Sequence, residues 1–168
     1  LTAAYEVIND ANNPKLDNAI ICAGGGGLTA GSCISIKHIN SECNVFTAEP
    51  EEWNDHQLSF EKNERVAMDT NRGGLCDGLL TPTPGEIPFA INTHFGVQGL
   101  SASDQAVCEA MRFAFNQLNL KLEPSGAVAL ACLLQNKEHF KGTRTLVMLS
   151  GGNVDQKTFS ECLARANP

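Results

Sequence analysis

The sequence is poor in aromatic residues and in positive charge. Only 6% of its 168 residues are aromatic, and 19 acidic residues against 12 basic ones give a net charge of −7. Binding to nucleic acid requires a basic surface that neutralises phosphates, so this composition argues against a nucleic-acid partner. No apolar run approaches the ~20 residues that span a bilayer, and no signal-peptide pattern opens the chain. We therefore expect no membrane partner.

Paired cysteines and clustered histidines are also missing. The seven cysteines are scattered singly without a C-x-x-C pair, and an odd number suits a disulfide framework poorly. This pattern predicts reduced thiols in a cytoplasmic protein. The four histidines show no metal-ligand spacing. With 42% hydrophobic and 18% charged residues, the chain is long enough to bury one core, and we expect residues 1–168 to form a single lobe.

What the sequence does contain is a run of four glycines, Gly24, Gly25, Gly26 and Gly27, between the apolar residues 19–23 and a helical segment. Each glycine loses more backbone freedom on folding than any other residue, so four in succession are an unfavourable way to build an ordinary turn. They present bare N–H groups at the start of a helix, where partial positive charge favours an anion. The run therefore predicts a loop that binds phosphate.

Strands and helices alternate along the chain. Short apolar runs predict buried strands at residues 20–23, 45–48 and 146–149. The helical spacing of apolar residues, with Ser103, Ser125 and a site near Asp155 as helix starts, predicts helices at residues 1–12, 28–39, 51–60, 103–118, 126–135 and from about 155. Residues 69–99 are rich in glycine and proline and predict a long ordered loop.

This alternation is typical of an α/β fold, in which helices cover both faces of a parallel sheet. Ligands of such sheets bind at the carboxyl ends of the strands. The glycine run, Glu49 and Ser150 each follow or end a predicted strand. We therefore expect the binding site to form from these three segments.

Two classes of ligand suit the glycine run. The pattern Gly25-x-Gly27-x-x-Ala30 matches a dinucleotide fingerprint, in which Glu49 would hold a ribose hydroxyl. The alternative is a single phosphate monoester, as carried by pyridoxal phosphate (PLP). Ser150 supports this alternative, because a serine hydroxyl can donate to an unprotonated pyridine nitrogen. An unprotonated ring is a weaker electron sink, which would favour elimination at the β-carbon.

Five short motifs follow one another along the chain. They are Gly24-Gly25-Gly26-Gly27-Leu28, Glu49-Pro50, Asp77-Gly78, Glu123-Pro124-Ser125-Gly126-Ala127 and Ser150-Gly151-Gly152-Asn153-Val154-Asp155. In order and spacing these motifs are similar to the C-terminal half of serine/threonine dehydratases and serine racemases, which are fold-type II PLP-dependent enzymes with a lobe like that of the tryptophan synthase β chain. The resemblance runs from Leu1 to about Asp155.

The resemblance implies PLP as the cofactor and assigns the residues that would hold it. The phosphate would be bound by the glycine run and Leu28, and the pyridine nitrogen by Ser150. Gly78 and Gly151 belong to the same set of cofactor-binding motifs. The resemblance also implies Mg²⁺ or Ca²⁺, held by the carboxylates of Glu49 and Asp55 with the carbonyl of Trp53, since such cations prefer oxygen ligands. A solvated acidic helix start is the alternative for Glu49 and Asp55.

The largest departure from the family is an absent lysine motif. The family's Schiff-base lysine lies upstream in a segment of the form S-x-K-x-R-G, and nothing similar occurs here. The resemblance therefore implies that a complementary N-terminal half carries the lysine, and that this chain alone is inactive. The chain's own lysines lie in polar settings: Lys15, Lys37, Lys62, Lys121, Lys137, Lys141 and Lys157.

For the complete protein, the resemblance implies β-elimination from L-serine or L-threonine, which yields a 2-keto acid and ammonia. It also implies a homodimer of the full enzyme. Within the same family, a racemase or a 3-hydroxyaspartate dehydratase remains open. Outside it, a non-catalytic ligand-binding half and an NAD-binding domain are the alternatives.

Overall fold

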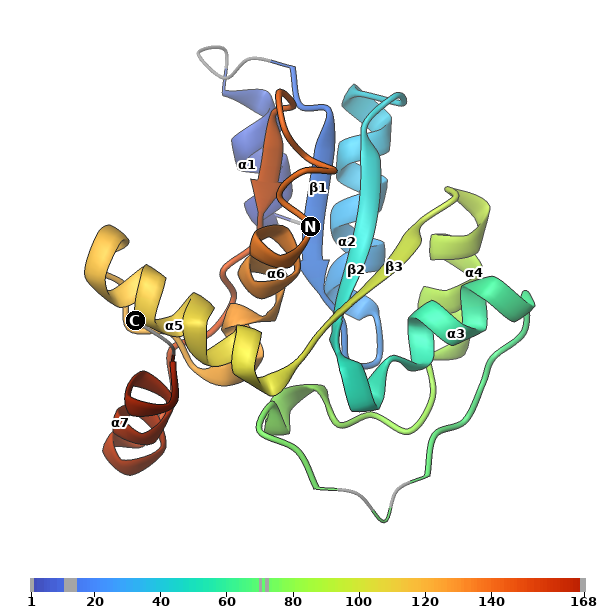
Figure 1. Cartoon of the computed structure of the whole chain (residues 1–168). Coiled ribbons are helices and arrows are strands. Elements are labelled where there is room, and N and C mark those ends of the chain that lie inside the picture. Colours follow the sequence, from blue (N-terminus) through green and yellow to red (C-terminus); the bar gives the residue numbers. More distant parts are fainter. Residues whose placement is uncertain (1, 11–14, 70, 72, 167–168) are drawn as a thin grey trace.

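The computed structural model describes residues 2–10, 15–69, 71 and 73–166. Its centre is a four-stranded parallel sheet in the order β3-β2-β1-β4 (Figure 1). In register, Ile20 lies opposite Phe46 on one side and Val147 on the other. The strands are β1 (Asn18–Cys22), β2 (Asn44–Pro50), β3 (Gln98–Ala102) and β4 (Thr145–Val147).

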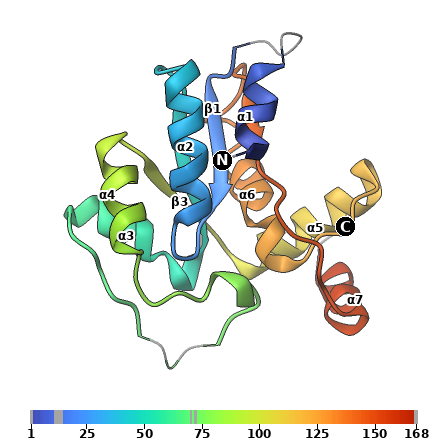
Figure 2. The ribbon, with the colours of Figure 1, turned by 180° about the vertical axis from the view of Figure 1, so that it is seen from behind.

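Helices cover both faces of the sheet, as the sequence predicts. Alternate side chains of β1 point to opposite cores: Ile20 belongs to the core that includes residues of α5, α6 and α7, whereas Ile21 belongs to the core that includes residues of α1 and α2. The views from front and back show these two layers (Figures 1 and 2). The helices are α1 (Thr2–Asn9), α2 (Gly27–Ile39), α3 (Asp55–Lys62), α4 (Glu86–His94), α5 (Asp104–Leu118), α6 (Pro124–Gln135) and α7 (Gln156–Arg165).

The prediction of a long loop at residues 69–99 is wrong over much of its length. Within its described part, the segment holds a 3₁₀ turn (Asp77–Leu79), the whole of α4 and the start of β3. Pro88 does not prevent α4, because the first turn of a helix tolerates proline. Gly99 does not prevent β3, because the strand passes so close to α3 that a Cβ there would lie 2.4 Å from Cα of Gln57. Residues 70 and 72 lie outside the described part.

Smaller differences concern the ends of elements. The predicted helix 51–60 is broken into a 3₁₀ turn (Glu51–Trp53) and α3. The predicted buried strand at 146–149 is a half-buried edge strand that ends at Val147. Helix α6 begins at Pro124 with Glu123 as its N-cap, so Ser125 lies inside the first turn. The predicted helix starts at Ser103 and Asp155 are confirmed, since each side chain accepts a backbone N–H of its own helix.

The most apolar helix lies inside the protein. Helix α6 is buried without interruption from Pro124 through Cys132. Across the described ranges, none of the helices has both the length and the apolar content needed to cross a bilayer. The apolar character of α6 is therefore explained by its central place between the sheet and α5, where it packs most of its surface against other elements.

Candidate functional site

The glycine loop joins β1 to α2 at the carboxyl edge of the sheet. Gly26 is the N-cap of α2 and adopts a left-handed conformation with φ of 86°. Two carbonyls of the loop already have backbone partners: that of Gly25 accepts from the amide of Gly85 at 3.0 Å, and that of Gly26 accepts from the amide of Ala30, within α2, at 2.9 Å. The first N–H groups of a helix have no partner within it, and no side chain caps α2. The loop therefore offers amides to an anion.

The shape of the loop leaves room for that anion. A Cβ built at Gly25 or at Gly27 meets no atom within 4 Å, and both residues are exposed. Leu28, in the first turn of α2, is 40% exposed beside them. By contrast, a Cβ at Gly24 would lie 3.1 Å from Oγ1 of Thr81. The loop is thus packed on one side and open on the other, which suits a phosphate group.

Gly78 lies next to this loop although it is 54 positions after Gly24 in the sequence. A Cβ at Gly24 would lie 3.3 Å from the carbonyl oxygen of Gly78. The amide of Gly78 donates to Oγ of Ser125 at 3.0 Å, which ties the 3₁₀ turn to the start of α6. The structure therefore brings Gly78 beside the glycine loop.

Ser150 reaches the same edge of the sheet through β4. The pairing of β4 with β1 extends to a bond from the amide of Met148 to the carbonyl of Ile20, at 3.0 Å. Beyond it, Oγ of Ser150 lies 3.0 Å from Sγ of Cys22, at the end of β1. Ser150 itself is exposed. Its hydroxyl can therefore meet a ligand whose phosphate lies in the glycine loop.

Gly151 has a packing role in this structure. Its carbonyl accepts the amide of Glu123 at 3.0 Å, and a Cβ on Gly151 would lie 2.3 Å from the Glu123 carboxylate. The other carboxylate oxygen of Glu123 accepts the amide of Asn153 at 2.9 Å. A Cβ on Gly126 would meet the backbone of Gly151 at 2.5 Å. These contacts hold the segment that carries Ser150 against the start of α6.

Glu49 and Asp55 form a buried pair rather than a solvated helix start. Both are 0% exposed. The carboxylate of Glu49 accepts the amides of His56 at 2.7 Å and Gln57 at 2.9 Å, so it caps α3. Burial raises the pKa of Glu49, the nearby Asp55 charge raises it further, and the two amides oppose the rise. A buried Glu49 also cannot reach a ribose hydroxyl, which removes the dinucleotide interpretation of this residue.

The surroundings of Asp55 fit a cation. Both of its carboxylate oxygens are buried and receive no hydrogen bond from an N–H or hydroxyl group, and burial raises its pKa while its contact with the Glu49 carboxyl opposes the rise. Trp53 precedes it in the 3₁₀ turn, with its indole N–H donating to the carbonyl of Gly73 at 3.3 Å. Among the described residues, no group of three or more His, Cys, Asp or Glu side chains forms a metal site. A cation here would therefore rely on two carboxylates and on backbone carbonyls, as Mg²⁺ and Ca²⁺ can.

Sequence reasoning missed Cys22 and His56 and gave no contact role to Glu123 and Ser125, although one of the motifs contains both. Each acts through a partner that lies far away in the sequence. Nε2 of His56 lies 2.9 Å from the carbonyl of Gly24, which is 32 residues earlier. No local pattern signals such contacts, because they depend on how β1, α3 and α6 pack.

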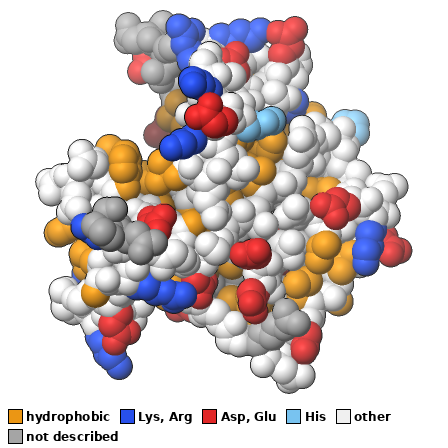
Figure 3. Space-filling model, viewed as in Figure 1, with side chains coloured by type: hydrophobic (Ala, Val, Ile, Leu, Met, Phe, Trp, Pro, Cys, Tyr) orange, Lys and Arg blue, Asp and Glu red, His pale blue; other side chains and the backbone are white. Residues whose placement is uncertain are grey.

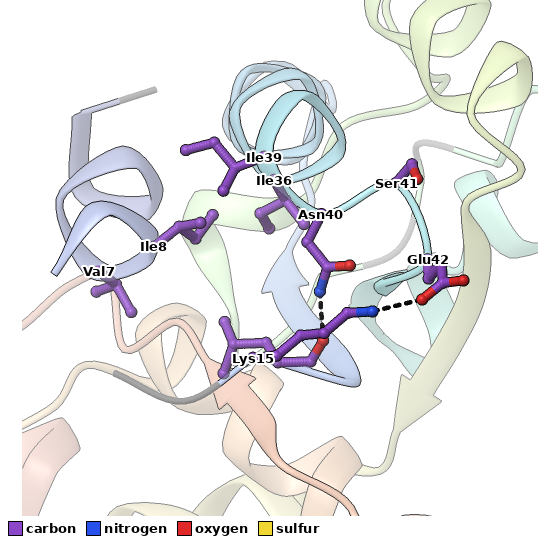
Figure 4. A pocket seen from close by; sticks show the side chains of 9 residues that line it. Val7, Ile8, Lys15, Ile36, Ile39, Asn40, Ser41 and Glu42 are labelled. Carbon is purple, nitrogen blue, oxygen red and sulfur yellow. Dashed lines mark hydrogen bonds and ion pairs between the residues drawn. The ribbon is translucent and has the colours of Figure 1, made fainter. Parts of the chain in front are cut away.

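A cavity of about 300 Å³ lies elsewhere, between α1 and the end of α2 (Figure 4). Ile8, Ile36 and Ile39 line it, and the ion pair of Lys15 with Glu42 lies at its side. Nearby, the side-chain amide of Asn40 donates to the carbonyl of Leu16 at 2.7 Å. These segments precede β1 and β2, so the cavity lies at the amino edge of the sheet and is not part of the glycine-loop site.

The fold and the site together define an α/β lobe whose glycine loop offers backbone amides to an anion at the carboxyl edge of a parallel sheet. The model of the family described as "pyridoxal-phosphate dependent enzyme" matches residues 1–151. The chain belongs to this family, whose cofactor is PLP. Membership of this family identifies PLP, rather than a dinucleotide, as the cofactor.

Individual relatives agree with this assignment. The chain is 33% identical to a serine racemase of Schizosaccharomyces pombe over 98% of this chain and 50% of the relative. It is 32% identical to an L-threo-3-hydroxyaspartate ammonia-lyase of Saccharomyces cerevisiae over 97% of this chain and 49% of the relative. The crystal structure of the T.th. threonine deaminase superimposes with a TM-score of 0.86 at 31% identity, over 92% of this chain and 50% of that one. The chain thus spans about half the length of these relatives.

Proposed function

We propose that the complete protein to which this chain belongs is a PLP-dependent ammonia-lyase for a β-hydroxy amino acid. The substrate loses water across its Cα–Cβ bond, and hydrolysis of the resulting unsaturated amine gives a 2-keto acid and ammonia. The names of the relatives support this class: they include ammonia-lyases for L-threo-3-hydroxyaspartate and L-threonine, and a phenylserine dehydratase. Serine, threonine and 3-hydroxyaspartate are therefore the proposed substrates.

In this proposal the chain binds both ends of the cofactor. Gly24, Gly25, Gly26, Gly27 and Leu28 hold the phosphate, and the Ser150 hydroxyl donates to the pyridine nitrogen. When bound, PLP supplies the electron sink that stabilises negative charge at Cα. The observation that carries the elimination chemistry is Ser150 beside Cys22, a hydroxyl and a thiol that are both too weakly acidic to protonate the ring. An unprotonated ring is the weaker electron sink, which favours early loss of the β-hydroxyl.

The proposal also requires a second polypeptide segment that supplies the Schiff-base lysine. Six of the seven lysines here are exposed and Lys37 is half-buried. The backbone of Lys121 approaches the Ser150 segment, but its Nζ lies over the ring of Phe159, 5.1 Å from the centroid. Large apolar side chains on and after α5, visible at the left of the surface view (Figure 3), support contact with further polypeptide. They include Phe113, Phe115, Leu118 and Leu120.

A second candidate is racemisation at the same site, which the serine racemase relatives support. The two reactions share removal of the Cα proton and differ in whether the β-hydroxyl then leaves. The complete protein, loaded with PLP, is incubated with L-serine, L-threonine and L-threo-3-hydroxyaspartate, with L-alanine as a control that has no β-hydroxyl. We expect keto acid and ammonia from at least one hydroxy amino acid and none from alanine. Release of the D-amino acid alone would favour the racemase, and PLP binding without product would favour a non-catalytic half.

A further inference from the structure

We propose that His56 is a positioning residue that holds the glycine loop in its anion-binding shape and couples that loop to the Glu49–Asp55 pair. The inference rests on the proposed role of the loop and adds a residue that none of the motifs contains. His56 lies at the start of α3, directly after Asp55, and is 0% exposed. Its ring faces the loop, while its backbone faces the acidic pair.

The imidazole contacts the loop through one polar atom. Nε2 lies 2.9 Å from the carbonyl oxygen of Gly24. A carbonyl can only accept, so the proton is on Nε2. Nδ1 is buried without a partner, which is consistent with the neutral ring. His56 therefore turns the Gly24 carbonyl inward, and this leaves the amides that follow free to face the anion.

The ring also fills the space beneath the tightest point of the loop. A Cβ on Gly26 would lie 2.4 Å from Cε1 of His56, so the ring packs directly against the glycine backbone. The ring of Phe60 also packs near the imidazole, at 5.8 Å between centroids. A smaller side chain at position 56 would leave the left-handed Gly26 without this support.

The link to the acidic pair runs through the backbone of the same residue. The amide of His56 donates to the Glu49 carboxylate at 2.7 Å, and the preceding residue is Asp55, whose two buried oxygens receive no N–H or hydroxyl donor and face the Glu49 carboxyl. A cation that draws the two carboxylates together acts on the first turn of α3. Because His56 belongs to that turn, its ring transmits the change to Gly24 and Gly26. Cation and phosphate should then bind with positive coupling.

The test compares two substitutions of His56 whose side-chain amides differ in length. The amide nitrogen of Gln in His56→Gln can occupy the place of Nε2, whereas the shorter side chain in His56→Asn cannot. Phe60→Leu is the matched control, because it alters the packing of the ring and leaves the hydrogen bond. Binding of inorganic phosphate and of PLP to the chain is measured by calorimetry in EDTA and in Mg²⁺. Mg²⁺ binding is followed by the fluorescence of Trp53, the single tryptophan, which lies two residues from Asp55.

We expect Mg²⁺ to raise the phosphate affinity of the wild-type chain and of His56→Gln by about fivefold or more. In His56→Asn the enhancement disappears, and phosphate binds about fivefold more weakly in EDTA, while the Mg²⁺ affinity changes little. If His56 only stabilised the fold, His56→Asn would lower the melting temperature, but Mg²⁺ would still raise the phosphate affinity of the variant. If His56→Asn does not fold, His56→Leu, which fills more of the space, replaces it.

Two other outcomes separate this inference from the proposed function. If the wild-type chain binds phosphate and PLP, and His56→Asn retains the full Mg²⁺ enhancement, the positioning role is wrong and the proposed function stands. If the wild-type chain binds neither phosphate nor PLP, the proposed role of the loop is wrong, and the inference built on it is overturned as well.

Discussion

The hydroxyl of Ser150 lies 3.0 Å from the thiol of Cys22, so the segment after β4 meets the end of β1 at the carboxyl edge of the sheet. A single residue separates Cys22 from the glycine loop. The contact therefore joins the two segments that would bind opposite ends of one small cofactor. Ser150, which we propose to contact the pyridine nitrogen, therefore has the uncharged thiol of Cys22 as its neighbour.

Replacing Ser150 tests this arrangement. Ser150→Ala should keep the phosphate contacts and lose one hydrogen bond, which lowers the PLP binding free energy by about 1 kcal/mol. Ser150→Asp should protonate the ring and shift the products of the complete enzyme away from elimination. The measurements are PLP affinity and keto-acid release. Wild-type values for both variants would show that Ser150 does not contact the ring.

Two neighbouring glycines should respond in opposite ways to the same methyl group. In Gly25→Ala the new methyl group points into open space, so the free energy of unfolding should change by no more than about 0.5 kcal/mol. The same methyl group occupies the open side of the loop where phosphate would lie, so phosphate affinity should fall by about tenfold or more. Gly26→Ala places a Cβ 2.4 Å from His56 at a φ of 86° and should destabilise the fold by about 2 kcal/mol or more. Chemical denaturation and phosphate calorimetry report the two effects. Normal phosphate binding by a folded Gly25→Ala variant would contradict the proposed loop.

The acidic pair should make stability depend on pH and on Mg²⁺. Burial raises the pKa of Asp55 to about 7, above its value of about 3.9 in the unfolded chain. The folded state therefore holds the proton more tightly, and in EDTA stability should fall as pH rises from about 4 to about 7. Mg²⁺, which binds the ionised pair, should offset this fall.

Asp55→Asn is the matched variant for that measurement, because it keeps the shape and removes the charge. Its melting temperature in EDTA should exceed that of the wild type at neutral pH and should no longer respond to Mg²⁺. Thermal unfolding across this pH range, in EDTA and in Mg²⁺, provides the comparison. An unchanged Mg²⁺ response in Asp55→Asn would place the cation elsewhere.

The isolated chain should not form a covalent adduct with PLP at any single lysine. A Schiff-base lysine needs a desolvated ammonium with a lowered pKa, and six of the seven lysines are exposed. Borohydride reduction of the chain with PLP, followed by mass spectrometry, should give no stoichiometric pyridoxyl-lysine. One fully labelled lysine would contradict the proposal that the lysine comes from a second segment.

The thiols should be unreactive in the folded chain. All seven cysteines are free and buried, and burial raises the pKa of Cys33 and Cys43 to about 11. At pH 8 the thiolate fraction at such a pKa is about 100-fold below that of an exposed cysteine. Alkylation by iodoacetamide should therefore be slow in buffer and fast in urea. Rapid labelling in buffer would show that the core opens readily.

Much of this protein was predictable because it depends on local chemistry. The glycine loop, the caps at Ser103 and Asp155, and the alternation of strands and helices come from the conformational preferences and hydrogen bonds of neighbouring residues. They are enough to determine the α/β class and to predict an anion site at the start of a helix. Helix α4 and strand β3 were not predicted, because Pro88 and Gly99 weaken the local preference for a helix and for a strand. Tertiary contacts compensate for this weak preference in the folded protein.

Only the tertiary structure decided how the parts of the site meet. The sequence predicted Glu49, Asp55 and Ser150 as site residues, but not the burial of the acidic pair, the contact of His56 with Gly24 or that of Ser150 with Cys22. The last two contacts join residues 32 and 128 positions apart. Hydrophobic patterning determines which face of each element is buried, whereas such pairings depend on how the strands are ordered in the sheet and how α3 and α6 pack against it.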